Sequence, residues 1–109
     1  MYKVNGTTIV LTRGDTFRAY ISIKKSDGND YVPAAGDSLR FALKRYPGSN
    51  DLLILKPIPL DTCLLQLDPE DTKNLPFGDY SYDIELDFAN GDVDTIIPNS
   101  RFVVDKEVY

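Results

Sequence analysis

The chain has 109 residues, with 42% hydrophobic and 27% charged side chains, which excludes a disordered chain and suits one domain over residues 1–109. Its net charge of −5 argues against a nucleic-acid backbone as the main partner. One cysteine and no histidine exclude an internal disulfide, histidine-based acid–base catalysis and the commonest zinc sites.

Membrane and export signals are not visible in the sequence. No apolar run approaches the ~20 residues that a membrane-spanning helix needs. The first residues lack the basic region and apolar core of a signal peptide. We therefore expect synthesis in the cytosol and no membrane partner.

Short segments that favour β-strands follow one another along the chain. Apolar and polar residues alternate in them with the period of two of a half-buried strand, and Gly, Asn, Asp and Pro fill the gaps. The expected strands cover residues 2–4, 7–12, 17–23, 39–44, 52–55, 63–67, 80–88, 93–97 and 101–104. About seven to nine short strands at this spacing predict an all-β, antiparallel sandwich or small barrel.

One segment between the strands has the chemistry of a helix start. Asp68 can act as the N-cap, Pro69 fits the first turn, and Asp71 suits the positive end of the helix dipole. Pro76 cannot continue a helix. We expect a single short helical turn near residues 69–74.

The strongest strand signal is the alternation over residues 80–88, which leads into Asn90-Gly91, a two-residue hairpin turn signal. The expected cross-strand pairs are Phe88–Val93, Leu86–Thr95, Ile84–Ile97 and Asp87–Asp94. The first three keep one face apolar, whereas the two facing aspartates cost up to about 1 kcal/mol.

The entry to this strand has the logic of an immunoglobulin-like sandwich. In such folds a corner tyrosine precedes the inward cysteine of the penultimate strand by two residues. Tyr80 fits that role, with its hydroxyl expected to return to the backbone near residues 71–74, and Tyr82 takes the cysteine's position. The sequence therefore predicts an immunoglobulin-like β-sandwich without the disulfide.

Two groups of acidic residues are candidate sites. Asp87, Asp92 and Asp94 would supply oxygen ligands to a cation, but they lack calcium-loop spacing and fit a solvated acidic face better. Asp83, Glu85 and Asp87 share one strand face and would imitate the paired carboxylates of a hydrolase. Such a stripe is usually the wet side of a sheet, so we expect no metal, no cofactor and no enzyme activity.

Cysteine and tyrosine offer two further alternatives. Cys63 lacks a histidine base, so a small core residue is expected rather than a nucleophile. A carbohydrate-binding or adhesion-type module of the same fold would expose coplanar tyrosines, with Tyr20, Tyr31 and Tyr46 as candidates.

The segment 52–55 is apolar on both faces, and Pro57 and Pro59 follow it. Because proline cannot donate to a β-ladder, this segment is expected at a sheet edge. Such a strand needs either core packing or cover from a partner chain. The residues expected at an interface are Leu52, Ile54, Ile58 and Leu60.

Taken together, the motifs resemble a small structural domain of phage and prophage tails from Gram-positive hosts, similar to the amino-terminal domain of upper baseplate proteins. The resemblance opens on Gly14-Asp15-Thr16 and closes on the Gly78-x-Tyr80-x-Tyr82-Asp83 hairpin. The other matching segments are residues 11–13, 27–28, 31, 36–37, 41–44, 67–72, 75, 79–84, 90–91 and 95–96.

That resemblance implies a fold and a role in assembly rather than a reaction. Such domains dock a longer fibre or receptor-binding region onto the tail, and the resemblance implies no catalytic residues. We expect a non-enzymatic structural protein of a phage or prophage tail or baseplate, acting by protein–protein contact. Its expected partners are other phage structural proteins or itself, and its expected location after assembly is the virion.

Overall fold

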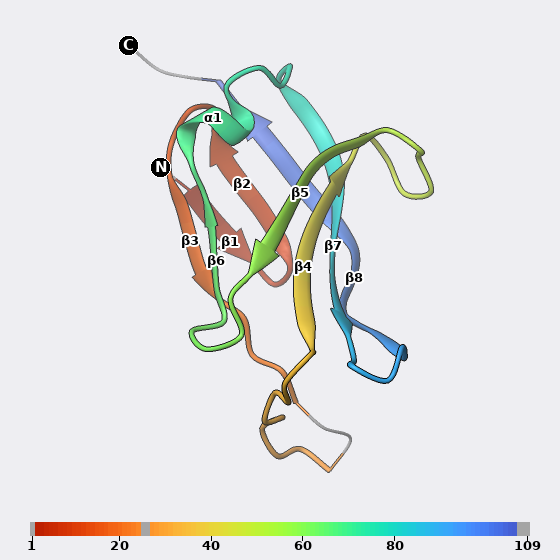
Figure 1. Ribbon diagram of the computed structural model, residues 1–109. Coiled ribbons are helices and arrows are strands. Elements are labelled where there is room, and N and C mark those ends of the chain that lie inside the picture. The colour runs from red at the N-terminus through yellow and green to blue at the C-terminus, as the bar shows by residue number, and fades with distance from the viewer. Residues whose placement is uncertain (1, 25–26, 107–109) are drawn as a thin grey trace.

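A computed structural model describes residues 2–24 and 27–106, with side chains from residue 6 onward. It contains strands and one short helix (Figure 1). These elements are β1 (Tyr2–Asn5), β2 (Thr8–Thr12), β3 (Phe17–Tyr20), β4 (Ser38–Lys44), β5 (Leu52–Ile58), β6 (Leu64–Leu67), α1 (Pro69–Thr72), β7 (Gly78–Asp87) and β8 (Val93–Asp105). The all-β class and the short helical turn are both confirmed.

The strands form a six-stranded sheet in the order β1-β2-β8-β7-β4-β5 and a two-stranded sheet of β3 and β6. Neighbouring strands are antiparallel, with the exception of β2 and β8, which run parallel. The expectation of a wholly antiparallel fold is therefore wrong at this pair. Parallel neighbours need a long crossover connection, and all the strands from β3 to β7 lie between β2 and β8 in sequence.

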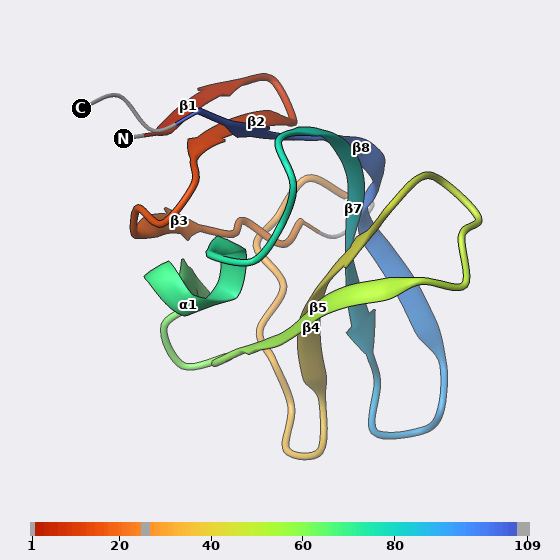
Figure 2. The ribbon, with the colours of Figure 1, turned by 90° about the horizontal axis from the view of Figure 1, so that it is seen from above.

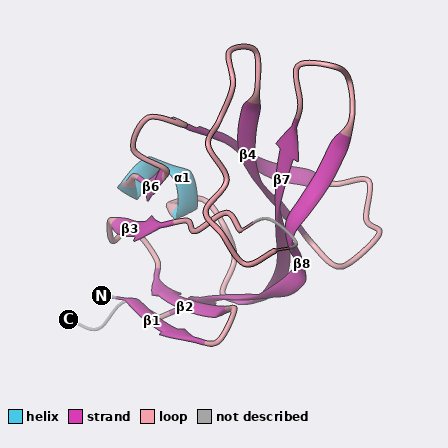
Figure 3. Cartoon of the chain, turned by 90° about the horizontal axis from the view of Figure 1, so that it is seen from below, coloured by secondary structure: helices cyan, strands magenta, loops and turns pink. Residues whose placement is uncertain are grey.

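The large sheet is strongly bent. Seen from above, β1, β2 and β8 form one side of the bend, while β7, β4 and β5 form the other (Figure 2). The β3–β6 ribbon lies on the concave side, between the two ends of the large sheet (Figure 3). The apolar face of every long strand therefore points into one enclosed core.

The core is built from the alternating apolar residues that the sequence indicates. Phe41, Tyr82 and Phe102 pack together at its centre, with ring centroids 5.4 Å apart for Phe41–Tyr82 and 6.1 Å for Phe41–Phe102. The other buried apolar side chains are Ile9, Leu11, Phe17, Ile23, Leu39, Ala42, Leu43, Ile54, Ile58, Leu65, Leu67, Tyr80, Ile84, Leu86 and Val104.

The β7–β8 hairpin differs from the expected register near its turn. Phe88 N–H donates to the Asp92 carbonyl, so the loop has three residues and Gly91 takes the left-handed conformation. Asp87 consequently lies opposite Val93, and the expected facing aspartates do not form. A bulge at Ile96 then restores the expected Ile84–Ile97 pair.

Two tyrosine hydroxyls tie β7 to the rest of the chain. Tyr80 donates to the Pro76 carbonyl at 2.6 Å, which confirms an upstream backbone bond but not the expected acceptor among residues 71–74. Tyr82 donates to the Thr7 carbonyl in the β1–β2 turn.

Candidate protein-contact surface

Strand β5 is an edge of the large sheet, as the prolines predict, and it pairs only with β4. Its Pro57 lies opposite Arg40 of β4. Because Pro57 has no N–H to give, its nitrogen suits the open edge rather than the β4 ladder. The backbone of β5 is therefore available on one side.

The residues expected at an interface divide between the core and the surface. Ile54 is only 7% exposed, and Ile58 is buried with it in the core. Leu60 is partly buried and packs against that core. Leu52 is 49% exposed, and Leu55, which was not among the expected contact residues, is 56% exposed.

A bulge explains why two leucines three positions apart share the outer face. Leu55 lies opposite Ala42, whereas Leu52 lies opposite Lys44, with the register shift between Leu43 and Lys44. Ala42 and Lys44 point to the same face of β4 because they are two residues apart. Leu52 and Leu55 therefore lie side by side on the outer face, and with Pro57 they form what we call the β5 edge patch.

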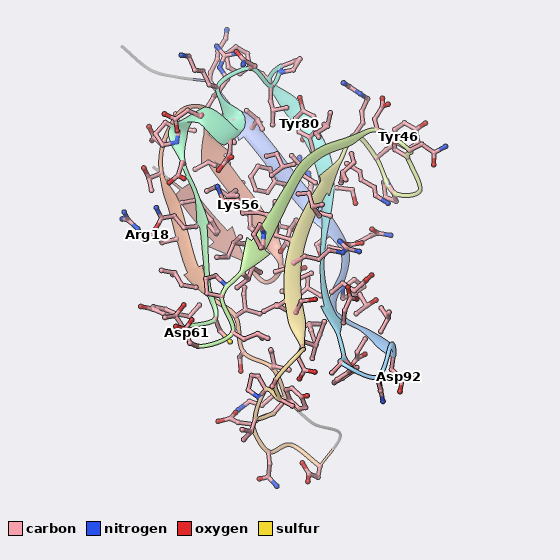
Figure 4. The ribbon with its side chains drawn as sticks, in the orientation of Figure 1. Arg18, Tyr46, Lys56, Asp61, Tyr80 and Asp92 are labelled. Atoms are coloured by element: carbon pink, nitrogen blue, oxygen red, sulfur yellow. The ribbon has the colours of Figure 1, made fainter. Side chains whose placement is uncertain are left out.

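The inward-facing Lys56 anchors β5 to the helical turn. Its Nζ lies 2.8 Å from Asp71 Oδ2 and 3.5 Å from Asp68 Oδ2. The hydrogen bond to Asp71 raises the pKa of Lys56, so the ammonium stays charged. Figure 4 shows Lys56 between β5 and the β6–α1 segment, and this anchor holds the edge strand in place.

Two of the three carboxylates in the β7 stripe, those of Asp83 and Glu85, form ion pairs with the neighbouring strand. Arg40 of β4 reaches Asp83 at 3.3 Å and Glu85 at 2.8 Å. Three clefts in the described part, of about 360, 240 and 160 Å³, are lined by other residues. Asp83 and Glu85 are therefore held in ion pairs, and none of these three clefts is lined by a residue of the stripe.

The candidate metal ligands do not come together. Asp92 is exposed at the β7–β8 turn, where its backbone N–H donates to the Asn90 side chain. Asp94 is exposed on β8, and Asp87 lies opposite Val93. Within residues 2–24 and 27–106, no three Cys, Asp or Glu side chains cluster closely enough to hold a metal ion.

The three candidate tyrosines do not form one platform. Tyr20 is 78% exposed at the end of β3, and Tyr46 is 60% exposed in the β4–β5 loop on the opposite side of the molecule (Figures 1 and 4). Tyr31 packs edge-on against Phe88, with ring centroids 5.7 Å apart, and its hydroxyl donates to Asp37.

Cys63 lies in the loop between β5 and β6. Its side chain is partly buried, packs against the core and has a free thiol. The sulfur lies 3.6 Å from the Leu60 carbonyl, and the backbone φ is 52°, which is unusual for a residue other than glycine. These contacts suit a structural residue, as the sequence indicates.

Comparison with known proteins leaves the chain without an assigned family. No protein-family model matches it, and no curated protein is significantly similar to it. Among the described residues, no helix has the length and apolar character needed to cross a membrane.

Proposed function

We propose that this protein is a non-enzymatic structural subunit that assembles by protein–protein contact, including contact with a second copy of itself, through the β5 edge patch. The observation that carries this proposal is the exposure of Leu52 and Leu55 on β5, an edge strand that pairs with β4 on one side only. Natural proteins usually protect such edges, because an open edge pairs with other chains.

Only half of the open β5 edge is protected against pairing with another chain. This supports a role in protein–protein contact for the other half. Pro57 and the following Pro59 remove N–H donors at the carboxyl end of β5, where β6 also lies close by. Leu52 and Leu55 lie in the half that has no proline. Burying one leucine side chain fully contributes about 1.5–3 kcal/mol, so a contact here gains from both leucines.

We further propose, from the sequence resemblance, that this subunit assembles into the tail or baseplate of a phage or prophage. Its location after assembly would then be the virion. Two of the resembling segments are in contact, because Gly14 N–H donates to the Thr72 hydroxyl at 3.0 Å. The protein would then be found in purified particles induced from the strain that encodes it. Its absence from intact, sequenced particles would contradict the proposal.

We also propose that the strands of this fold follow an immunoglobulin-like topology. Its support is the Tyr80 hydroxyl, which bonds to the backbone a few residues upstream as in a tyrosine corner. The burial of Tyr82, two residues later, adds to that support.

A single-cysteine experiment tests the contact at β5. Leu55→Cys in a Cys63→Ala background leaves one thiol, on the edge patch. We expect mild oxidation to yield a disulfide-linked dimer. The matched control is Val93→Cys in the same background, because Val93 is also exposed but lies on β8. Equal dimer yields from the two variants would count against the β5 contact.

A further inference from the structure

The largest of the three clefts is lined by no residue of the β5 edge patch. It includes Cys63 of the β5–β6 loop, whose Asp61 is labelled in Figure 4. It has a volume of about 360 Å³, which is within the range of small-molecule sites. Its lining residues are Tyr20, Ile21, Ser22, Ile23, Asp30, Tyr31 and Cys63.

Backbone hydrogen bonds hold the cleft open between three segments. Ile21 N–H donates to the Cys63 carbonyl at 2.8 Å, which extends the β3–β6 pairing past the end of β3. Tyr31 N–H donates to the Ile23 carbonyl at 3.0 Å, which brings the returning segment alongside. The site is therefore formed by the fold before any ligand arrives.

The floor and the walls of the cleft differ in chemistry. Ile23 is buried, and Ile21 and Cys63 are partly buried, so the floor is apolar. Tyr20 and Ser22 are exposed at the wall, and the Ser22 hydroxyl makes no hydrogen bond within the described residues. The cleft thus offers an open aromatic ring next to an available hydroxyl.

The charged residues at the cleft limit the chemical class of ligand that it can bind. Among the described residues that line the cleft there is no lysine or arginine, so this lining offers no cation to a phosphorylated ligand. Asp30 forms an ion pair with Lys24, which leaves little net charge to attract an amine. Its carboxylate oxygens and the Tyr31 phenol still provide hydrogen-bonding groups. A neutral ligand with one apolar face and several hydroxyls suits this lining best.

We propose that this cleft binds a neutral saccharide, with the apolar face of a pyranose ring against Tyr20 and its hydroxyls directed to Ser22 and Asp30. The site is independent of the β5 contact, because it uses none of the residues of the edge patch. Of the three candidate tyrosines, Tyr20 and Tyr31 line the cleft, and Tyr46 does not.

The test is a titration of the ¹⁵N-labelled full chain, followed by amide chemical shifts, with methyl glucoside, methyl mannoside and N-acetylglucosamine. At least one of these saccharides is expected to shift the Ser22 and Tyr31 amides and to bind about millimolar or weaker. Tyr20→Ala should weaken that binding about twofold to tenfold, because it removes one aromatic contact. The control Tyr46→Ala, which changes an exposed tyrosine that does not line the cleft, should leave the binding unchanged.

Three results would overturn the proposal. The first is that none of the three saccharides shifts these amides. The second is that Tyr46→Ala weakens binding as much as Tyr20→Ala. The third is that choline chloride or sodium phosphate shifts the same amides more strongly than every saccharide, since the cleft would then recognise charge.

Discussion

Asp37 joins the β3–β4 loop to the β7–β8 loop through one carboxylate. It accepts hydrogen bonds from the Tyr31 hydroxyl at 2.6 Å, from Ala34 N–H at 2.9 Å and from Ala89 N–H at 3.0 Å. The Tyr31 hydrogen bond is the main cause that lowers the pKa of Asp37 below its ordinary value of 3.8, and the Ala34 N–H adds to it. These bonds stabilise the ionised form in the folded protein.

The lowered pKa gives the stability a defined dependence on pH. Because the folded pKa is below the unfolded one, the contribution is fully present above about pH 5 and is lost as the pH falls through the folded pKa. Urea unfolding between about pH 7 and pH 2 should show a smaller acid-induced loss in Asp37→Asn than in the parent. Asp61→Asn, an exposed aspartate of the β5–β6 loop, is the control and should behave as the parent.

Removal of a single hydroxyl, that of Tyr80, gives a second test of what stabilises the fold. Tyr80→Phe removes the hydroxyl that donates to the Pro76 carbonyl, while the ring stays buried. We expect a loss of about 1 kcal/mol in the free energy of unfolding, because Pro76 is exposed and water can replace the donor. Tyr46→Phe should leave the urea midpoint unchanged, and an equally small effect of Tyr80→Phe would show that the corner bond contributes nothing.

Alanine substitutions at two loop glycines distinguish the cost of backbone strain from the cost of a steric clash. Gly36 and Gly91 both have a left-handed backbone, with φ of 91° and 94°. A Cβ on Gly36 would lie 2.9 Å from the Ala89 Cβ, whereas one on Gly91 would meet nothing within 4 Å. Gly91→Ala should cost about 1–2 kcal/mol, and Gly36→Ala about 1–3 kcal/mol more.

A double variant isolates the contact. In the Gly36→Ala background, Ala89→Gly should recover the part of the lost stability that comes from the clash, and none of the part that comes from φ. Thermal or urea unfolding of the four proteins provides the comparison. Equal costs for the two glycine substitutions would contradict the contact.

The same loop contact explains where the sequence-based hairpin prediction failed. Local propensity favoured a two-residue turn at Asn90-Gly91, but the Ala89 N–H is held by Asp37, which lies on the loop before β4. The three-residue loop and its shifted register therefore depend on a long-range contact that no local pattern reveals. The Ile84–Ile97 pair was predictable because both residues face the core.

Edge and helix signals were predictable because they depend on nearby residues alone. Proline chemistry predicted the edge position of β5 and the start of α1. The exposure of Leu55 and the Arg40 bridge to Asp83 and Glu85 were not predictable, because each depends on which strand lies alongside. The pairing of β4 with β5 and β7 is a property of the whole fold.

At the scale of the whole molecule, the parallel pairing of β2 with β8 could not be predicted from the sequence either. It joins segments from opposite ends of the described chain, and nothing in either strand indicates its direction. The β5 edge patch and the cleft lined by Tyr20 share no residue. The proposed assembly and the proposed saccharide binding are therefore expected to respond to different single substitutions.

The central claim is that the β5 edge patch mediates self-assembly, and the solution mass tests it most directly. Multi-angle light scattering over a range of concentrations should give the parent a mass above the 12.2 kDa of one chain. Leu55→Asp should give 12.2 kDa with an unchanged unfolding midpoint, while the control Val93→Asp keeps the parent mass. A parent that stays at 12.2 kDa throughout, or a Leu55→Asp variant that keeps the mass of an assembled parent, would contradict the account.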